Sequence, residues 1–298
     1  MNMMDNVKYG LLYGALWVLA LLPMRMLYVL SDFVAFVIHR VVRYRVDVVR
    51  KNLKASFPEK SQKELREIEA KFYHYLCDTF IETIKLIHLS EKALRKRIVV
   101  TNSDVVNNLV EQERPIILFM GHYGNWELMP AQMLSIRCLS VMGALYKPLH
   151  NKVMNRLMLR LRGTLGLLCI PNSRAYRMLV DLKRQGKPFM VGFIADQRPL
   201  GQQLHHWTEF MGQPTAYMAG GEAIGDRVGA LYLYLDIRRT KRGYYELTYC
   251  EIEPPIDDNE PFPVTRRFFE MLEATIRRGP AYWLWSHNRW KAKPPVSL

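Results

Sequence analysis

Short apolar runs alternate with amphipathic helical stretches between residues 116 and 278, and this alternation restricts the fold more than any other feature of the sequence. Runs this short and this apolar are typical of buried strands, and strands joined through helices lie parallel in one sheet. The predicted strands are Ile116–Met120, Leu139–Leu145, Leu167–Ile170, Phe189–Ala195, Ala230–Asp236 and Tyr245–Glu251. The predicted helices are Asp104–Gln112, Asn125–Leu134, Asn151–Arg162, Ser173–Gln185, Ala216–Arg227 and Pro263–Arg278.

The last two predicted strands are separated only by Arg238–Gly243, which indicates a hairpin. A longer amphipathic helix, from Ser61 to about Leu89, begins with a capping box formed by Ser61 and Glu64. We therefore expect an α/β fold with a mixed, mostly parallel sheet flanked by helices, preceded by an N-terminal helical segment.

The N-terminal segment is strongly apolar. Tyr9–Leu22 carries no charge, but it is shorter than the roughly 20 residues that a perpendicular membrane span requires. Pro23 and Arg25 interrupt it before a second run, Met26–Ile38, which contains Asp32. Three interpretations stay open: one kinked span, a pair of helices lying in the membrane interface, or a helical hairpin packed on the following domain.

A cluster of basic residues follows directly: Arg40, Arg43, Arg45, Arg50, Lys51 and Lys54. Together with a net charge of +14, it predicts an anionic partner, and its position favours a membrane surface. The positive-inside rule places it on the cytoplasmic side. Residues 1–45 are therefore predicted to be a membrane-anchoring segment and residues 46–298 an α/β domain. The sequence contains no recognition motif for nucleic acid, which is not expected as a partner.

The block Gly121–Glu127 carries the strongest sign of chemistry. It places an imidazole, His122, and a carboxylate, Glu127, after a predicted strand. On a continuous helix these two positions would diverge by about 140°, so they meet only if His122 lies in a turn. Gly121 and Gly124 permit that turn, and Asn125 is a suitable N-cap for the next helix. We expect Glu127 to orient His122 as a general base; the alternative is a buried histidine satisfied by a local carboxylate.

Other polar residues follow neighbouring strands. Tyr146 and Lys147 come after one predicted strand and Asp196 ends another, and ligands of open α/β sheets bind at the carboxyl ends of strands. Arg162 is expected to polarise a carbonyl group or bind an anionic group, with Arg160 as the second candidate. Taken singly, Asp196 could be a turn residue and both arginines a solvated helix surface.

Several short segments, in order, resemble the bacterial lipid A biosynthesis acyltransferase family, from about residue 40 to the C-terminus. The matching segments are Arg50–Leu53 with Phe57 and Pro58, Gly121–Glu127, Tyr146–Pro148 with Asn151, Arg160 and Arg162, Asp196 and Gln197, Phe210–Gly212 with Pro214 and Thr215, and Pro280 to Lys291 with Tyr282, Trp285, His287 and Arg289. Lys147 departs from the arginine usual at its position and offers a point charge without a bidentate fork.

The resemblance implies an O-acyltransferase domain at residues 46–298, with acyl carrier protein as the acyl donor and a lipid A precursor or related lysolipid as the membrane acceptor. His122, Glu127 and Arg162 are then the expected catalytic residues. Asn125, Tyr146, Lys147, Arg160 and Asp196 are expected to contact or position substrate, with Asp196 holding an arginine or Lys147. It also implies the bacterial inner membrane, with the catalytic domain on the cytoplasmic side.

No metal or cofactor is expected beyond the acyl thioester, since His205 and His206 have no third ligand at a suitable spacing. The four cysteines are far apart and predict neither a zinc site nor a disulfide framework. Acyl-coenzyme A as donor and another aminolipid or glycolipid as acceptor stay open. Two other classes are a hydrolase, for which the nucleophile motif is missing, and a non-catalytic lipid-binding protein of the membrane surface.

Overall fold

The computed structural model describes residues 2–137, 141–199, 204–253 and 261–294. Within these residues, one sheet has the strand order β1-β9-β8-β2-β5-β3-β4, and β6 and β7 form a separate hairpin. The strands are β1 (Ile98–Val100), β2 (Ile116–Met120), β3 (Val141–Tyr146), β4 (Leu168–Pro171), β5 (Phe189–Ile194), β6 (His206–Phe210), β7 (Gln213–Tyr217), β8 (Leu231–Lys241) and β9 (Tyr244–Glu251).

The large sheet is parallel except for one pair. β2 pairs in parallel with β5 and β8, β3 pairs in parallel with β5 and β4, and β1 is parallel to β9. Only β8 and β9 are antiparallel among these strands, as their short connection predicts. The central strand β2 is buried at every position, which explains its uniformly apolar sequence. The predicted mixed, mostly parallel α/β fold is confirmed.

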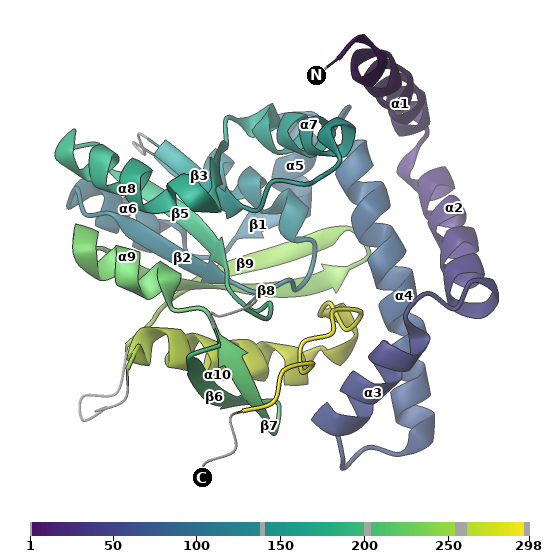
Figure 1. Cartoon of the computed structure of the whole chain (residues 1–298). Coiled ribbons are helices and arrows are strands. Elements are labelled where there is room, and N and C mark those ends of the chain that lie inside the picture. The colour runs from purple at the N-terminus through teal and green to yellow at the C-terminus, as the bar shows by residue number, and fades with distance from the viewer. Residues whose placement is uncertain (1, 138–140, 200–203, 254–260, 295–298) are drawn as a thin grey trace.

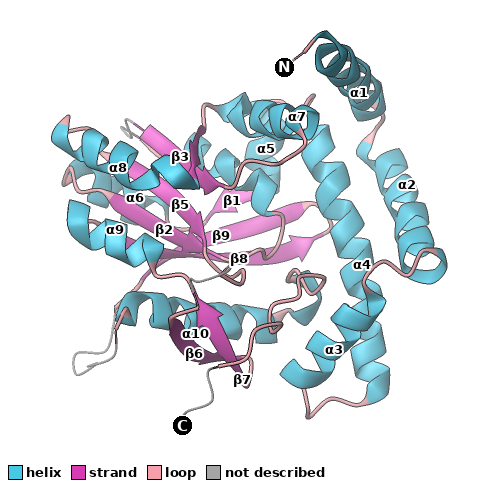
Figure 2. Cartoon of the chain, viewed as in Figure 1, coloured by secondary structure: helices cyan, strands magenta, loops and turns pink. Residues whose placement is uncertain are grey.

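The α-helices are α1 (Met3–Leu21), α2 (Met24–Phe36), α3 (Val46–Ser56), α4 (Gln62–Lys85), α5 (Glu91–Arg97), α6 (Ser103–Glu111), α7 (Lys152–Arg162), α8 (Ala175–Arg184), α9 (Gly220–Val228) and α10 (Pro263–Arg278). Helices flank the sheet, as Figure 2 shows. On one face, Phe119 of β2 packs 5.3 Å from Phe268 of α10, measured between ring centroids. The capping box predicted at Ser61 and Glu64 is present at the start of α4.

Helix α4 runs beside the sheet and carries α2 on its outer side (Figure 1). The α2 residues that face α4 include Ser31, whose hydroxyl donates to Asp78 of α4 over 2.8 Å. Arg242, in the β8–β9 turn, joins the two helices by bonding both Asp32 (2.7 Å) and Asp78 (2.6 Å). The charge of Asp32 within the apolar N-terminal sequence is thus explained by an ion pair that fastens α2 to the α/β domain.

The opposite surfaces of α1 and α2 are open and apolar. Exposed side chains recur at helical spacing along both helices; we call this set the N-terminal apolar surface, and it comprises Met4, Val7, Leu11, Val18, Met26, Val29, Phe33 and Phe36. Within the described chain, no single helix is long and apolar enough to cross a membrane. Met3–Leu21 and Met24–Val41 meet the length and composition test only as a pair, and that pair is bent by 118°.

Several predicted elements need correction. The helix expected at Asn125–Leu134 is a 3₁₀ helix, η2 (Trp126–Ser135), which contains Pro130, a residue without the N–H that an α-helix interior uses. The helix expected to begin at Ala216 begins at Gly220, because Ala216 lies in strand β7. The first two residues of the predicted strand Leu139–Leu145 lie outside the described residues. The pattern did not predict α3, α5, β1 or the β6–β7 hairpin.

Candidate active site

The register of two neighbouring strands brings His122 and Asp196 together. Met120, the last residue of β2, lies opposite Ile194, the last residue of β5. His122 and Asp196 each follow two residues later, so they leave the same edge of the sheet side by side. Nδ1 of His122 lies 2.6 Å from Oδ1 of Asp196. The sequence analysis expected Glu127 to be the partner of His122, but the partner is Asp196. Asp196 therefore holds an imidazole, and not an arginine or Lys147 as expected.

Asp196 is buried, with 2% of its side chain exposed, and three donors converge on its carboxylate. The backbone N–H of His122 donates to Oδ2 over 2.8 Å, and the indole N–H of Trp283 donates to the same oxygen over 2.7 Å. Burial alone would raise the pKa of Asp196, but the nearby imidazole and the hydrogen bonds outweigh it and hold the pKa below its usual value. The group is thus an ionised acceptor at neutral pH.

The two nitrogens of His122 therefore have different roles. An ionised carboxylate accepts only, so Nδ1 carries the proton and Nε2 has a lone pair that can accept a hydrogen bond. Nε2 lies 3.0 Å from the side-chain amide nitrogen of Gln197, which donates to it. The ring packs edge-on against Trp126, and 16% of the side chain is exposed. An imidazole arranged in this way can take a proton from a hydroxyl group that replaces the amide.

The turn that carries His122 is held from two sides. Gly124 has a φ of +57°, a left-handed conformation that glycine adopts without strain, as the predicted turn requires. The hydroxyl of Tyr75, on α4, donates to the Gly124 carbonyl over 2.7 Å. On the other side, the backbone N–H of Gly124 donates to the carbonyl of Tyr282 over 2.9 Å, and the backbone N–H of Leu284 donates to the carbonyl of His122 over 3.1 Å. These contacts hold the backbone of the turn from which the imidazole projects.

Gly121 serves the site by its small size. A Cβ atom placed on Gly121 would lie 2.6 Å from a methyl carbon of Leu272, on α10, and 3.4 Å from Oδ2 of Asp196. Its backbone is in an ordinary conformation, so the positive φ expected for it is found at Gly124 only. Close packing against α10, and not the turn itself, explains this glycine.

Glu127 is paired with Arg162. The guanidinium of Arg162 donates from Nε and Nη2 to the two carboxylate oxygens, over 2.7 and 2.5 Å. Glu127 lies in the first turn of η2, and its partner Arg162 is the last residue of α7. Although burial acts to lower it, the Glu127 carboxylate raises the pKa of Arg162, which is charged. Three of the five guanidinium N–H groups are left for another acceptor.

Asn125 is placed differently from expectation. Its side chain makes no capping hydrogen bond to η2 and has no exposed surface. The amide instead donates to Glu82 and to the Thr79 carbonyl of α4, over 2.9 and 3.3 Å. It therefore fastens the turn to α4 and has no access to a substrate in this conformation.

The remaining predicted residues are spread around the site. Tyr146 ends β3, beside β5, and Lys147 follows it with an exposed side chain. Tyr146 lies close enough to Arg162 to influence its charge. Arg160 is directed elsewhere: its guanidinium lies 4.1 Å from the ring centroid of Tyr13 and bonds the hydroxyl of Tyr9, both on α1. Arg160 holds α1 against α7 and is not part of the group around His122.

The sequence pattern missed how the C-terminal segment supports the site. Trp283 donates directly to Asp196, and no role was predicted for it. Asn52, from the predicted motif Arg50–Leu53, is buried in α3 and donates to the carbonyls of Trp285 and His287, both over 2.9 Å. The motif near the N-terminus and the motif near the C-terminus thus form one contact. Their co-occurrence was the only available signal.

The chain is similar to known acyltransferases along nearly its whole length. The model of the family described as bacterial lipid A biosynthesis acyltransferase matches residues 3–292. A lipid A biosynthesis palmitoleoyltransferase of Escherichia coli K12 is 25% identical over 287 residues, covering 94% of this chain and 90% of the relative. A lipid A biosynthesis lauroyltransferase of the same organism is 22% identical with the same coverage. With a family match over nearly its whole length, the chain belongs to the bacterial lipid A biosynthesis acyltransferase family.

Proposed function

We propose that this protein transfers a fatty acyl chain from an acyl carrier protein thioester to a hydroxyl group of a lipid A precursor, with His122 as the general base. Family membership supports acyl transfer to lipid A. The observation that best supports the chemistry is the 2.6 Å contact of His122 with Asp196, which leaves Nε2 of a partly exposed ring as the proton acceptor.

In the proposed reaction, Nε2 of His122 removes the proton of the acceptor hydroxyl while its oxygen attacks the thioester carbonyl carbon. The buried carboxylate of Asp196 stabilises the imidazolium that forms. The tetrahedral intermediate then collapses with cleavage of the carbon–sulfur bond, and the imidazolium returns its proton to the departing thiolate. The reaction uses neither an acyl-enzyme nor a metal or cofactor, and the acyl thioester is its co-substrate.

Gln197 occupies the position that the acceptor hydroxyl needs, because its amide donates to Nε2 over 3.0 Å. In the proposed complex, the hydroxyl displaces this amide and donates to the same lone pair. The amide can then turn towards the new oxygen without any change in the backbone. In the free enzyme, Gln197 thus supplies the hydrogen bond to Nε2 that the acceptor hydroxyl supplies in the complex.

Arg162 is the proposed donor to the carbonyl oxygen or to an anionic group of the substrate. Its three remaining N–H groups are charged donors, which bind a developing oxyanion more strongly than neutral donors do. Glu127 is then a positioning residue, since it fixes the guanidinium by two hydrogen bonds. Tyr146 and Lys147, at the end of β3, extend this side of the proposed substrate site.

The N-terminal apolar surface supports attachment to the membrane that holds the acceptor. Its exposed side chains lie on α1 and α2, and the basic cluster beginning at Arg40 follows immediately. We propose that α1 and α2 lie in the bacterial inner membrane's cytoplasmic interface, with the basic cluster among anionic head groups. The positive charge would also attract an acidic acyl carrier protein.

The product formed from a radiolabelled acyl carrier protein thioester and bacterial membrane lipid tests this function. Label transferred to lipid A precursor supports the proposal. Release of free fatty acid would instead indicate a hydrolase, and absence of turnover would favour a non-catalytic lipid-binding protein. Transfer from acyl-coenzyme A alone, or to another glycolipid or aminolipid, would correct the donor or the acceptor.

A further inference from the structure

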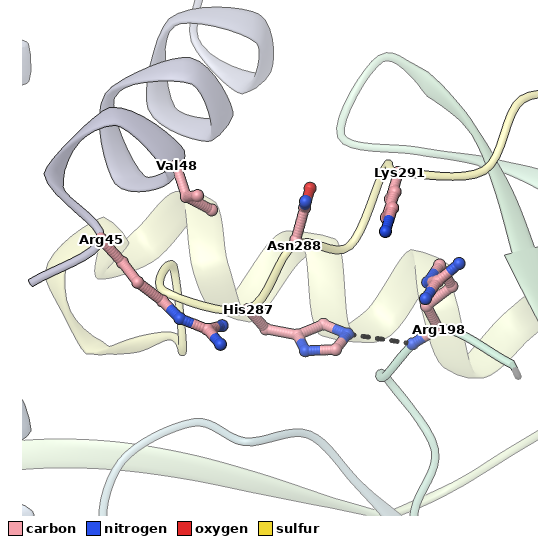
Figure 3. Close-up of a pocket in the computed structure, with 6 residues that line it drawn as sticks. All are labelled: Arg45, Val48, Arg198, His287, Asn288 and Lys291. Atoms are coloured by element: carbon pink, nitrogen blue, oxygen red, sulfur yellow. Dashed lines mark hydrogen bonds between the residues drawn. The ribbon is translucent and has the colours of Figure 1, made fainter.

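We propose that a basic pocket beside His122 binds a phosphate group carried by the membrane acceptor. The inference rests on the proposed acyl transfer. The pocket has a volume of about 480 Å³ and is lined by Arg45, Val48, Arg198, His287, Asn288 and Lys291 (Figure 3). These residues come from three separate parts of the chain: the start of α3, the loop after β5 and the C-terminal segment.

The pocket gathers positive charge without a counter-charge. Arg45, Arg198 and Lys291 all line it, and in the described part of the chain no carboxylate lies within ion-pair distance of them. The Nε–H of Arg198 is buried and has no acceptor among the described residues. Cations brought together in this way repel one another unless an anion binds between them. Two guanidinium groups and one ammonium group are a donor set well suited to phosphate oxygens.

The backbone and His287 hold this donor set in place. The backbone N–H of Arg198 donates to Nε2 of His287 over 3.3 Å. The proton of the neutral His287 ring is therefore on Nδ1. Arg45 has a left-handed backbone, with a φ of 53°, and its guanidinium donates to the carbonyl of Ser286 over 2.9 Å. A residue other than glycine held in this conformation indicates that the surrounding structure fixes Arg45 at the pocket.

The position of the pocket indicates what carries the phosphate. Arg198 lies two residues beyond Asp196, and His287 lies in the segment whose Trp283 donates to Asp196. The opposite wall begins at Arg45, directly after the exposed Val41, Val42 and Tyr44. The pocket thus lies between the reacting imidazole and an apolar surface. A lipid-borne phosphate can use both at once, whereas a soluble anion would have no use for the apolar surface.

A phosphate bound in this pocket would position the acceptor hydroxyl near His122. The phosphate would make no covalent bond. Its binding would hold the acceptor hydroxyl in the orientation that the reaction needs. Loss of the pocket should therefore weaken acceptor binding chiefly and leave the chemistry of His122 in place. Charge-assisted hydrogen bonds of this kind change affinity by about tenfold or more when one partner is removed.

The kinetic test uses the full chain in detergent micelles and two acceptors, a phosphorylated lipid A precursor and the same lipid with its phosphates removed. We expect a KM about tenfold lower or better for the phosphorylated lipid. Arg198→Gln and Lys291→Gln should each raise that KM towards the value for the dephosphorylated lipid, with little change for the latter. Lys291 is exposed, so its variant should fold normally. The matched control is Lys183→Gln, at an exposed position of α8.

Equal KM values for the two lipids in the wild type, or an unchanged preference in both variants, would overturn the proposal. A higher KM for the acyl carrier thioester instead of the lipid would overturn it too, by assigning the pocket to the donor.

A binding measurement separates this proposal from the proposed function. The measurement is the broadening of the ³¹P signal of inorganic phosphate by His122→Ala protein. It detects binding and needs no turnover. The pocket predicts broadening that is lost when Arg198→Gln and Lys291→Gln are added. Such a loss would support the pocket even if the wild type transferred no acyl group, and equal broadening by both proteins would refute it.

Discussion

At the scale of single residues, the site consists of a buried carboxylate, Asp196, and a partly exposed imidazole, His122. Asp196 receives three hydrogen bonds and is ionised, whereas His122 keeps one nitrogen available. The arrangement has the logic of hydrolase triads, in which a carboxylate fixes the tautomer of a histidine. Here the group to be deprotonated would be the acceptor's own hydroxyl. Glu127 bonds Arg162, and in the proposed reaction it acts only through that arginine.

Asp196→Asn tests the role of the buried carboxylate. Asparagine can present an N–H to Nδ1 and so favour the wrong tautomer, without a large change in volume. We expect the acyl transfer rate at saturating substrates to fall by about 10²- to 10⁴-fold, with the fold preserved by circular dichroism. Asp181→Asn, at an exposed position of α8, is the control and should be close to wild type. A loss of less than about threefold in Asp196→Asn would refute the assignment.

His287 predicts a pH dependence of stability. Burial lowers the pKa of His287 from 6.5 to about 4; Asp196 partly opposes this effect, and the charges of Arg289 and Arg198 add to it. Between those two values the unfolded chain binds the proton and the folded chain does not. The stability contribution is therefore complete above about pH 6.5 and is lost progressively towards pH 4.

The free energy of unfolding, measured by urea denaturation at pH 7.5 and pH 5, should fall for the wild type on acidification. His287→Gln should lose part of that fall, because glutamine has no proton to gain. His205→Gln, at an exposed position, should retain it. Identical pH dependence in wild type and His287→Gln would contradict the prediction.

At the scale of secondary-structure elements, α3 supports the active site indirectly. Its Asn52 binds two carbonyls of the C-terminal segment, and Trp283 of that segment binds Asp196. Phe57, at the end of α3, packs against Trp285 with ring centroids 5.8 Å apart. Segments separated by more than 200 residues of sequence thus fix the same edge of the sheet.

Asn52→Ala tests how much the contact between α3 and the C-terminal segment contributes to the free energy of unfolding. It removes the only side-chain donor that the structure describes for the Trp285 and His287 carbonyls, in a buried position. We expect a loss of about 1–3 kcal/mol in the free energy of unfolding by urea. Lys51→Ala, next to it and exposed, should change stability by less than about 0.5 kcal/mol. Equal stability of the two variants would show that α3 does not support the segment.

The sequence predicted the strands around the site well, because strands buried on both faces have continuous apolar runs such as Ile116–Met120. It also predicted that His122 and Asp196 would leave the same edge. It could not identify the pair, because sequence does not give the order of strands, and only the adjacency of β2 and β5 selects Asp196 over Glu127. The 3₁₀ conformation of η2 likewise depends on local packing and Pro130.

At the scale of the whole molecule, apolar and basic surfaces adjoin at the N-terminus. Arg242 holds α2 on the α/β domain through Asp32 and Asp78, so the α2 part of the N-terminal apolar surface is fastened to that domain. Val29 and Phe33 lie one helical turn apart on this surface and are 70% and 64% exposed. A surface of this kind is suited to lie in the interface of a bilayer.

Replacement of Val29 and Phe33 by serine tests membrane attachment. Binding to vesicles of phosphatidylglycerol and phosphatidylcholine, measured by co-sedimentation, should weaken about tenfold or more, since each large apolar side chain contributes about 1.5–3 kcal/mol when buried. The melting temperature should not fall, because both side chains are exposed. Tyr176→Ser, at an exposed aromatic residue on α8, is the control and should bind like the wild type. Equal binding by all three proteins would exclude this surface as the membrane contact.

The central claim is that the imidazole of His122 removes the proton of a lipid hydroxyl during acyl transfer. The most direct measurement is the initial rate of acyl transfer from acyl carrier protein thioester to lipid A precursor by folded wild-type and His122→Ala proteins. The account predicts a fall of at least about 10²-fold in the variant, with an unchanged melting profile. Transfer at a near-normal rate by His122→Ala would contradict it.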